Sequence, residues 1–273
     1  MFEKALVAVD LSPAQDALLA HLEDLQGWGV QHLVLAHVIP LGYVAGAGFA
    51  QPEEFRGWLE ERAAPLRRAG LLVTTSVSTT GLVADELSSV AALEGASLVV
   101  VGSRSHNLLY ELFLGGVAQE LLRQATLPVL IVRLGVNGHA VPLELDRVLL
   151  ATDLSDASKG AEETALGLAP KAARIDCLTV LPGTPSDEDR VALERAHADL
   201  VQRIAAAGGK ATSRIEDGDV DAHLADAAAA GYSLVIVGKH GQNWLEGKLI
   251  GTTAAKLCET SKLPVLMVPT PKR

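Results

Sequence analysis

The sequence predicts an α/β protein made of two doubly wound, open parallel five-stranded sheets with helices on both faces. Three observations lead to this fold class. The chain repeats itself in order over most of its length, its short strand-like runs are apolar almost throughout, and helix-period segments separate those runs. Strands that are buried on both faces and alternate with helices are typical of parallel sheets built from right-handed βαβ units.

The internal repeat divides the 273 residues into two copies. The matching segments, in chain order, are Leu6–Ser12 with Leu149–Ser155, His37–Pro40 with Thr179–Pro182, Leu98–Gly102 with Leu234–Gly238, and Leu127–Val132 with Leu263–Val268. The first copy has a longer, Gly-rich segment at 41–55, which shifts the later matches. We therefore expect two domains, residues 1–134 and 144–270, joined by a connector around 135–143.

In the first copy, the order of elements follows from the period of the apolar residues. Short apolar and β-branched runs predict strands, and segments with a 3.6-residue period predict helices. The predicted strands with distinct bounds are Lys4–Val9, His32–Val38, Leu98–Val101 and Val129–Val132. The predicted helices are Ala14–Leu25, Val83–Leu93 and Val117–Arg123.

Composition limits the classes of partner. Apolar residues make up 49% of the chain and charged residues 21%, which is typical of a globular protein. The formal net charge of −10 argues against a general nucleic-acid or anionic-membrane surface. No apolar stretch approaches the roughly 18 residues of a membrane span, and the first residues lack a signal-peptide pattern, so we expect a soluble, cytoplasmic protein. Cys177, Cys258 and the histidines show no metal-ligand spacing, which predicts buried thiols and no metal site.

The residues after the strands of the second copy are the candidate binding residues, because open parallel sheets bind ligands at the carboxyl ends of their strands. Asp153 follows the first strand, Val180 ends the second, and the run from Gly238 to Thr252 has the spacing G-x2-G-x9-G-T. Glycines let backbone N–H groups approach phosphate oxygens, and Gly251-Thr252 opens a helix whose N-terminus favours anions. Lys239, His240 and Lys248 add positive charge nearby.

At this point both halves resemble universal stress protein domains, and the chain resembles a tandem member of the ATP-binding branch of that family. The resemblance covers about 1–134 and 144–270. It implies an adenine-nucleotide α-hydrolase-like fold and an intramolecular pseudo-dimer, in which the last strands, Pro128–Val132 and Pro264–Val268, pair antiparallel. Whether two whole chains associate as a homodimer stays open.

The resemblance also assigns roles in adenine-nucleotide binding. Asp153 and the Val180 backbone would contact adenine and neighbouring groups, Gly238 would lie against the ribose, and the later glycines and threonines would hold phosphates. The predicted nucleotide-binding residues are Thr152, Asp153, Val180, Gly238, Lys239, His240, Gly241, Gly251, Thr252 and Thr253. Asp153 could also serve only to start a helix, and the glycines could be plain turn residues.

The first copy departs from the motif. Its weaker equivalents are Asp10, Val38, Gly102, Ser105 and Gly115. Ser105 stands at the position of Gly241, where a Cβ would block close phosphate approach if the backbone there needs a positive φ. Gly116 stands at the position of Thr252, which removes a hydrogen bond worth about 0.5–1.5 kcal/mol. We expect the first copy to bind nucleotide weakly or not at all.

Three functions fit these observations. The first is a stress-response regulatory protein that binds ATP, with Mg²⁺ as accompanying ion, as a switch or a structural ligand, and that acts on an unidentified regulatory partner. The second is a slow ATPase, for which His240 is the only candidate base near the phosphates. The third is an interaction module that binds no nucleotide.

Overall fold

The computed structural model describes residues 1–12, 15–39, 52–79, 81–104, 114–134, 141–241 and 250–270. It divides into two compact units, residues 2–142 and residues 143–273 with Met1. Most of the Gly-rich segment 41–55 and of the connector 135–143 lies outside the described residues.

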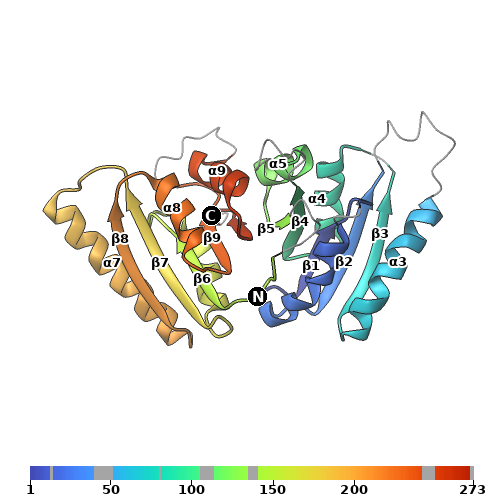
Figure 1. The fold of residues 1–273 in the computed structure, drawn as a ribbon, viewed down its shortest axis with the longest axis horizontal. Helices are drawn as coiled ribbons and strands as arrows, with labels where there is room; N and C mark the ends of the chain where they lie inside the picture. The colour runs from blue at the N-terminus through green and yellow to red at the C-terminus, as the bar shows by residue number, and fades with distance from the viewer. Residues whose placement is uncertain are drawn as a thin grey trace. The chain divides into compact units, whose positions relative to one another are not determined.

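Both units have the same succession of strands and α-helices, and the first has an additional 3₁₀ helix (Figure 1). In the first unit these are β1 (Lys4–Ala8), α1 (Gln15–Ala20), the 3₁₀ helix η1 (Leu22–Trp28), β2 (His32–Val38), α3 (Pro52–Arg68), β3 (Leu72–Ser78), α4 (Val83–Leu93), β4 (Leu98–Arg104), α5 (Gly116–Gln124) and β5 (Val129–Leu134). In the second unit they are β6 (Arg147–Ala151), α6 (Lys159–Leu168), β7 (Arg174–Leu181), α7 (Asp187–Ala206), β8 (Ala211–Asp217), α8 (Val220–Ala229), β9 (Leu234–Gly238), α9 (Thr252–Thr260) and β10 (Val265–Val268).

The strand order within each unit confirms the predicted fold class. It is β3-β2-β1-β4-β5 in the first unit and β10-β9-β6-β7-β8 in the second, with parallel neighbours throughout each set. In the second unit α6 contacts α7, and α8 contacts α9, so two pairs of helices cover the two faces of the sheet. The chain order reverses between β6 and β9, which makes the carboxyl ends of these strands the topological switch point.

The first predicted helix, Ala14–Leu25, differs from the structure. The α-helix ends at Ala20, and a 3₁₀ helix follows from Leu22 to Trp28. Side chains three residues apart eclipse one another in a 3₁₀ helix. Leu22, Leu25 and Trp28 have this spacing, and all three are 0% exposed. The tighter helix therefore directs three apolar side chains into the core.

The remaining predicted elements lie within a few residues of their observed bounds. β2 and α4 begin and end where predicted, whereas β4 and β5 extend beyond their apolar runs. β3 and β8, whose bounds were not distinct in the sequence, are the outer strands of their sheets. Their residues are mostly half-buried or exposed, because an outer strand has neighbours on one side only.

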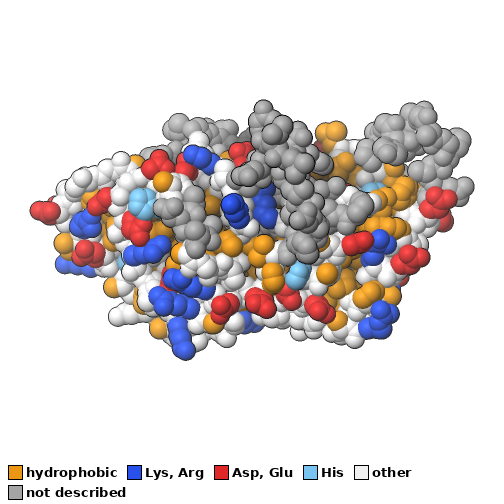
Figure 2. Space-filling view, viewed as in Figure 1, with side chains coloured by type: hydrophobic (Ala, Val, Ile, Leu, Met, Phe, Trp, Pro, Cys, Tyr) orange, Lys and Arg blue, Asp and Glu red, His pale blue; other side chains and the backbone are white. Residues whose placement is uncertain are grey.

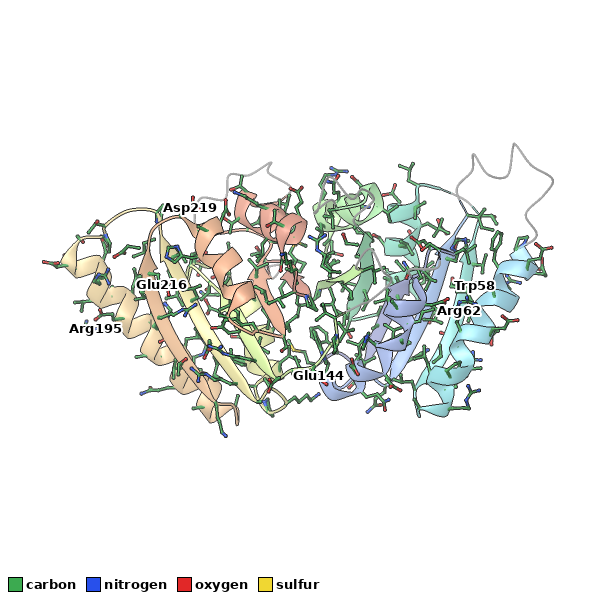
Figure 3. The ribbon with its side chains drawn as sticks, viewed as in Figure 1. Trp58, Arg62, Glu144, Arg195, Glu216 and Asp219 are labelled. Carbon is green, nitrogen blue, oxygen red and sulfur yellow. The ribbon has the colours of Figure 1, made fainter. Side chains whose placement is uncertain are left out.

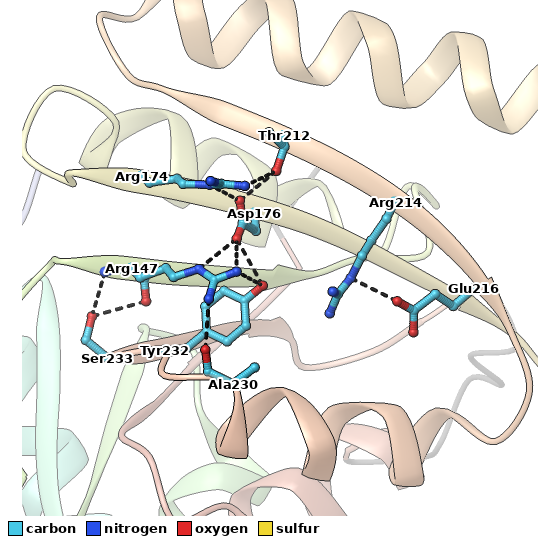
Figure 4. A network of polar contacts seen from close by, with 9 residues as sticks. All are labelled: Arg147, Arg174, Asp176, Thr212, Arg214, Glu216, Ala230, Tyr232 and Ser233. Carbon is cyan, nitrogen blue, oxygen red and sulfur yellow. Dashed lines mark hydrogen bonds and ion pairs between the residues drawn. The ribbon is translucent and has the colours of Figure 1, made fainter.

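A buried carboxylate joins three strands at the amino end of the second sheet (Figure 4). Asp176 on β7 is 4% exposed. Its Oδ1 accepts from Arg174 Nε at 2.5 Å and from Thr212 Oγ1 at 2.6 Å. Its Oδ2 accepts from Arg147 Nε and from the Tyr232 hydroxyl, each at 3.0 Å. The four donors fix the register of β6, β7 and β8 at the end of the sheet away from the switch point.

Two features of the described residues concern partners: the surface charges of the second unit and the hydropathy of the helices. On the face of the second unit drawn in Figure 2, Lys and Arg side chains stand among Asp and Glu side chains. Within the described part of the chain, no helix has both the length and the apolar character that a bilayer crossing requires. The cytoplasmic location stays a prediction.

Candidate functional site

A cleft of about 860 Å³ opens at the switch point of the second unit. Its floor is formed by the carboxyl ends of β6, β7 and β9, and its walls by the loops that follow these strands and by the amino-terminal halves of α7, α8 and α9. The ten residues predicted from the second copy all line it: Thr152, Asp153, Val180, Gly238, Lys239, His240, Gly241, Gly251, Thr252 and Thr253.

The loop after β6 holds Asp153 in a fixed orientation. Asp153 Oδ1 accepts hydrogen bonds from the Ser155 N–H at 3.1 Å and the Ser155 hydroxyl at 2.7 Å. Leu154 between them has φ 58°, the left-handed region that a branched side chain seldom adopts. Asp153 therefore stabilises a turn, whereas Ser158 is the N-cap residue of α6, and this turn also brings Oδ2 opposite Gly241.

A buried chain of hydrogen bonds lies behind this loop. The Thr179 hydroxyl donates to the Thr152 carbonyl oxygen at 2.6 Å, and His197 Nε2 lies 2.9 Å from the Thr179 hydroxyl oxygen. Because the single hydroxyl proton of Thr179 goes to Thr152, His197 Nε2 is the donor. Burial lowers the pKa of His197, so the ring is neutral. Its Nδ1 has no hydrogen-bond partner among the described residues.

On the other side of the loop, the Thr152 hydroxyl reaches the Glu162 carboxylate at 3.0 Å and accepts from the Leu154 N–H at 3.0 Å. Thr152, Glu162 and His197 are all less than 9% exposed. The sequence analysis did not single out Glu162, Thr179 or His197. Their spacing along the chain matches no motif, and only the fold brings them together.

The glycines of the motif are required by close approach and not by backbone angle. A Cβ on Gly241 would lie 2.7 Å from Asp153 Oδ2, and a Cβ on Gly251 would lie 3.2 Å from the Lys239 carbonyl oxygen. Neither residue has a positive φ. The condition of a positive φ is therefore not met at Gly241, and steric contact with Asp153 provides the restriction instead. The equivalent Ser105 lies outside the described residues.

The start of α9 faces the cleft without a capping side chain. Gly251 is the N-cap residue, with φ −68° and ψ 146°, and makes no side-chain cap bond. Thr252 is exposed and Thr253 half-buried, and both line the cleft. The first N–H groups of a helix have no partner within the helix, and its dipole makes this end partly positive. This end of the cleft can therefore bind an anion.

Two residues with cationic character lie between β9 and α9. Lys239 is 7% exposed, and its N–H donates to the Val268 carbonyl oxygen at 2.7 Å. His240 Nδ1 lies 3.4 Å from the hydroxyl oxygen of Thr270, which in turn donates to the Ala157 carbonyl oxygen at 3.2 Å. Lys248 lies outside the described residues.

The first unit repeats part of this geometry. Asp10 Oδ1 accepts from the Ser12 N–H at 3.1 Å and the Ser12 hydroxyl at 2.5 Å, as Asp153 does from Ser155. Val38 ends β2, and Gly102 lies in β4 with its hypothetical Cβ 2.8 Å from a Leu134 methyl group. Gly115 caps α5, but a Cβ there would have no atom of the described residues within 4 Å. The close approach found at Gly251 thus has no counterpart at Gly115.

Both cysteines are free and buried, as the sequence predicted. Burial, followed by the nearby charges of Asp176 and Glu162, raises the pKa of the Cys177 thiol to about 12. A thiol in this state is a poor nucleophile and metal ligand at neutral pH. Among the described residues, no three His, Cys, Asp or Glu side chains lie together as metal ligands would.

Comparison with known proteins identifies relatives of both units. A family model described as the universal stress protein family matches residues 1–133 and 144–269. A universal stress protein of Mycolicibacterium smegmatis is 28% identical over 289 residues, which cover 96% of this chain and 96% of that protein. YxiE, a universal stress protein of Bacillus subtilis, is 30% identical over 152 residues, which cover 49% of this chain and 100% of that protein. A solved universal stress protein structure from Archaeoglobus fulgidus has a TM-score of 0.73 at 22% identity, over 98% of this chain and 97% of that one.

Proposed function

Because the chain belongs to the universal stress protein family, we propose that it is a stress-response regulatory protein whose second domain, residues 144–270, binds ATP. The first domain, residues 1–134, is a related unit that binds nucleotide weakly or not at all. The observation that carries the proposal is the cleft at the switch point, because it collects all ten residues predicted from the motif of the second copy.

The base and ribose lie over the carboxyl ends of β6 and β7 in this proposal. The apolar part of the cleft, which includes Leu181 and Pro182, offers a surface for a flat base. Asp153 and the Val180 backbone belong to this part of the floor, where they bind the edge of adenine and its neighbouring groups. Gly238, at the end of β9, lets the ribose approach the backbone.

The phosphates lie at the start of α9. Gly241 and Gly251 leave space that a Cβ would fill, and this space fits a ligand that approaches the backbone closely. The Thr252 and Thr253 N–H and hydroxyl groups are the donors, and Lys239 and His240 supply cationic character. Mg²⁺ would accompany the ATP phosphates, because it binds through phosphate oxygens.

The family resemblance supports three further parts of the proposal. They are the antiparallel pairing of Pro128–Val132 with Pro264–Val268, the pseudo-dimer that this pairing produces, and a regulatory protein partner that responds to the nucleotide. ATP serves as a switch or as a structural ligand, and these two roles differ in whether nucleotide removal unfolds the second domain.

Titration calorimetry of nucleotide-stripped protein with Mg-ATP tests the proposal. We expect one site per chain. The Gly241→Ala variant should bind Mg-ATP roughly ten- to hundredfold more weakly, because the new Cβ displaces the Asp153 side chain and the site loses one hydrogen bond to a charged group. Gly183→Ala is the matched control, since a Cβ at Gly183 has nothing within 4 Å. Absence of binding by the wild-type protein would refute the proposal and favour an interaction module without nucleotide.

A further inference from the structure

Helices α3 and α7 are equivalent in the two units, which allows their cleft-facing positions to be compared. His37 Nδ1 lies 2.8 Å from the Val9 carbonyl oxygen, and Thr179 makes the corresponding bond to Thr152. In the sheet registers, Val34 pairs with Thr74, and Asp176 pairs with Thr212. These pairs put β3 and β8 at an offset of 138 residues, and the helix ends show the same offset, because Gly70 N–H donates to the Arg67 carbonyl as Gly208 N–H donates to the Ala205 carbonyl.

The burial pattern supports this offset. Leu59 and Leu66 are buried on α3, and their counterparts His197 and Ile204 are buried on α7. Between them the further buried residue is shifted by one position, to Ala63 on α3 and Leu200 on α7. The two helices therefore present corresponding residues to corresponding places above their sheets.

In the second unit, small and flexible residues of α7 form one wall of the cleft. Ala196 and Leu193 line it, together with Pro182 and Pro185 from the preceding loop and Leu224 from α8. Thr179 lies on the floor of this end of the cleft. This apolar end is the space that the proposed function assigns to the base.

In the first unit, aromatic residues stand at the same two helix positions. Phe55 corresponds to Leu193, and its ring lies 5.2 Å from that of His37, the counterpart of Thr179 on the cleft floor. Trp58 corresponds to Ala196. Figure 3 shows Trp58 beside Arg62, whose guanidinium carbon lies 3.5 Å from the centre of the indole ring.

Arg62, which is paired with Asp16, stacks on the Trp58 indole. Arg62 Nε donates to Asp16 Oδ1 on α1 at 2.9 Å, so the guanidinium is fixed between α1 and the Trp58 ring. A stacked and paired arginine restricts the rotation of the indole beneath it. Trp58 and Phe55 thus stand at the helix positions that border the open apolar end in the second unit.

We propose that the side chains at these two helix positions decide which unit accepts a nucleotide base. Ala196 and Leu193 leave the second unit open, whereas Trp58 and Phe55 fill the first unit with its own side chains. This inference rests on the proposed function of the second unit. It differs from the loss of phosphate-binding groups in the first copy, because it concerns the base end of the site and predicts an effect on ligands that carry no phosphate.

The direct test transfers the first unit's residue into the second. Ala196→Trp is expected to weaken Mg-ATP binding by at least roughly tenfold in calorimetry, because the indole occupies the base space. Ala198→Trp is the matched control, since Ala198 is an exposed alanine on the same helix and the same change there leaves the cleft open. Circular dichroism and thermal melting verify that both variants are folded.

The reciprocal variant, Phe55→Leu with Trp58→Ala, is titrated with adenosine, which needs no phosphate-binding groups. We expect one equivalent of adenosine to bind the wild-type chain and two to bind the variant. Retention of wild-type affinity by Ala196→Trp, or an unchanged single equivalent in the reciprocal variant, would overturn the inference while the proposed function stands. A wild-type chain that binds neither ligand would refute both.

Discussion

Replacing Asp176 by Asn tests how much the buried carboxylate of the second unit contributes to stability. The substitution keeps the shape of the side chain but exchanges one acceptor oxygen for an NH₂ donor and removes the charge. Whichever oxygen is replaced, two of the four donors lose their acceptor. The pair is either Arg174 with Thr212 or Arg147 with Tyr232.

The magnitude follows from the burial of these donors. A hydrogen bond to a charged group contributes about 1.5–3 kcal/mol when it is shielded from water. The Arg147 and Arg174 side chains are 35% and 48% exposed, so water compensates for part of the loss. We therefore expect the free energy of unfolding of the second unit to fall by about 2–3 kcal/mol, which lowers its Tm by roughly 5–10 °C.

The pH dependence gives a second measurement of the same network. Burial alone would raise the pKa of Asp176, but the hydrogen bonds from Thr212, Arg174, Arg147 and Tyr232 outweigh it and lower that pKa. A carboxylate with a lowered folded-state pKa stabilises the protein above its unfolded pKa of about 3.9, and this stabilisation is lost as the pH falls through the folded-state pKa. The difference in Tm between wild type and variant should therefore be largest at pH 7 and should decrease below about pH 4.

Calorimetric melting of the two proteins at pH 7 and at acidic pH provides the assay. Asp199→Asn, at an exposed position on α7, is the control and should change the free energy of unfolding by less than about 0.5 kcal/mol. A Tm for Asp176→Asn that equals that of the control at pH 7 would refute the reasoning. It would mean that the desolvation of the carboxylate cancels its four hydrogen bonds.

Two further predictions concern single residues. The Cys177 thiol, with a pKa raised to about 12, should not react with an aromatic disulfide reagent at pH 8 until the protein unfolds, and a rapid reaction of the native protein with labelling at Cys177 would contradict this. Leu154→Asn should raise the free energy of unfolding in a denaturant titration by about 0.5–1 kcal/mol, because Asn tolerates the φ of 58° better than Leu. Leu11→Asn, at the equivalent position of the first unit, where φ is not positive, should give no such gain, and an equal gain there would remove the explanation by strain.

Sequence reasoning predicted the buried, regular parts of the fold well and the outer parts less well. The bounds of β2 and α4 follow directly from apolar periodicity, because both elements are covered by the core. The edge strands β3 and β8 have mixed burial and therefore no continuous apolar run. The helix after β1 begins as an α-helix but continues as a 3₁₀ helix, a choice made by the packing of Leu22, Leu25 and Trp28.

The sequence by itself determined the repeat, the alternation of strands and helices, and ten of the residues that line the cleft. These properties depend on local patterns and on the rule that parallel strands end at a common edge. The tertiary structure alone decided that Gly241 lies against Asp153, that His197 reaches Thr152 through Thr179, and that Ala196 lines the cleft. Such contacts join residues from separate elements, so their geometry depends on how helices pack on the sheet and leaves no periodic signal in the chain.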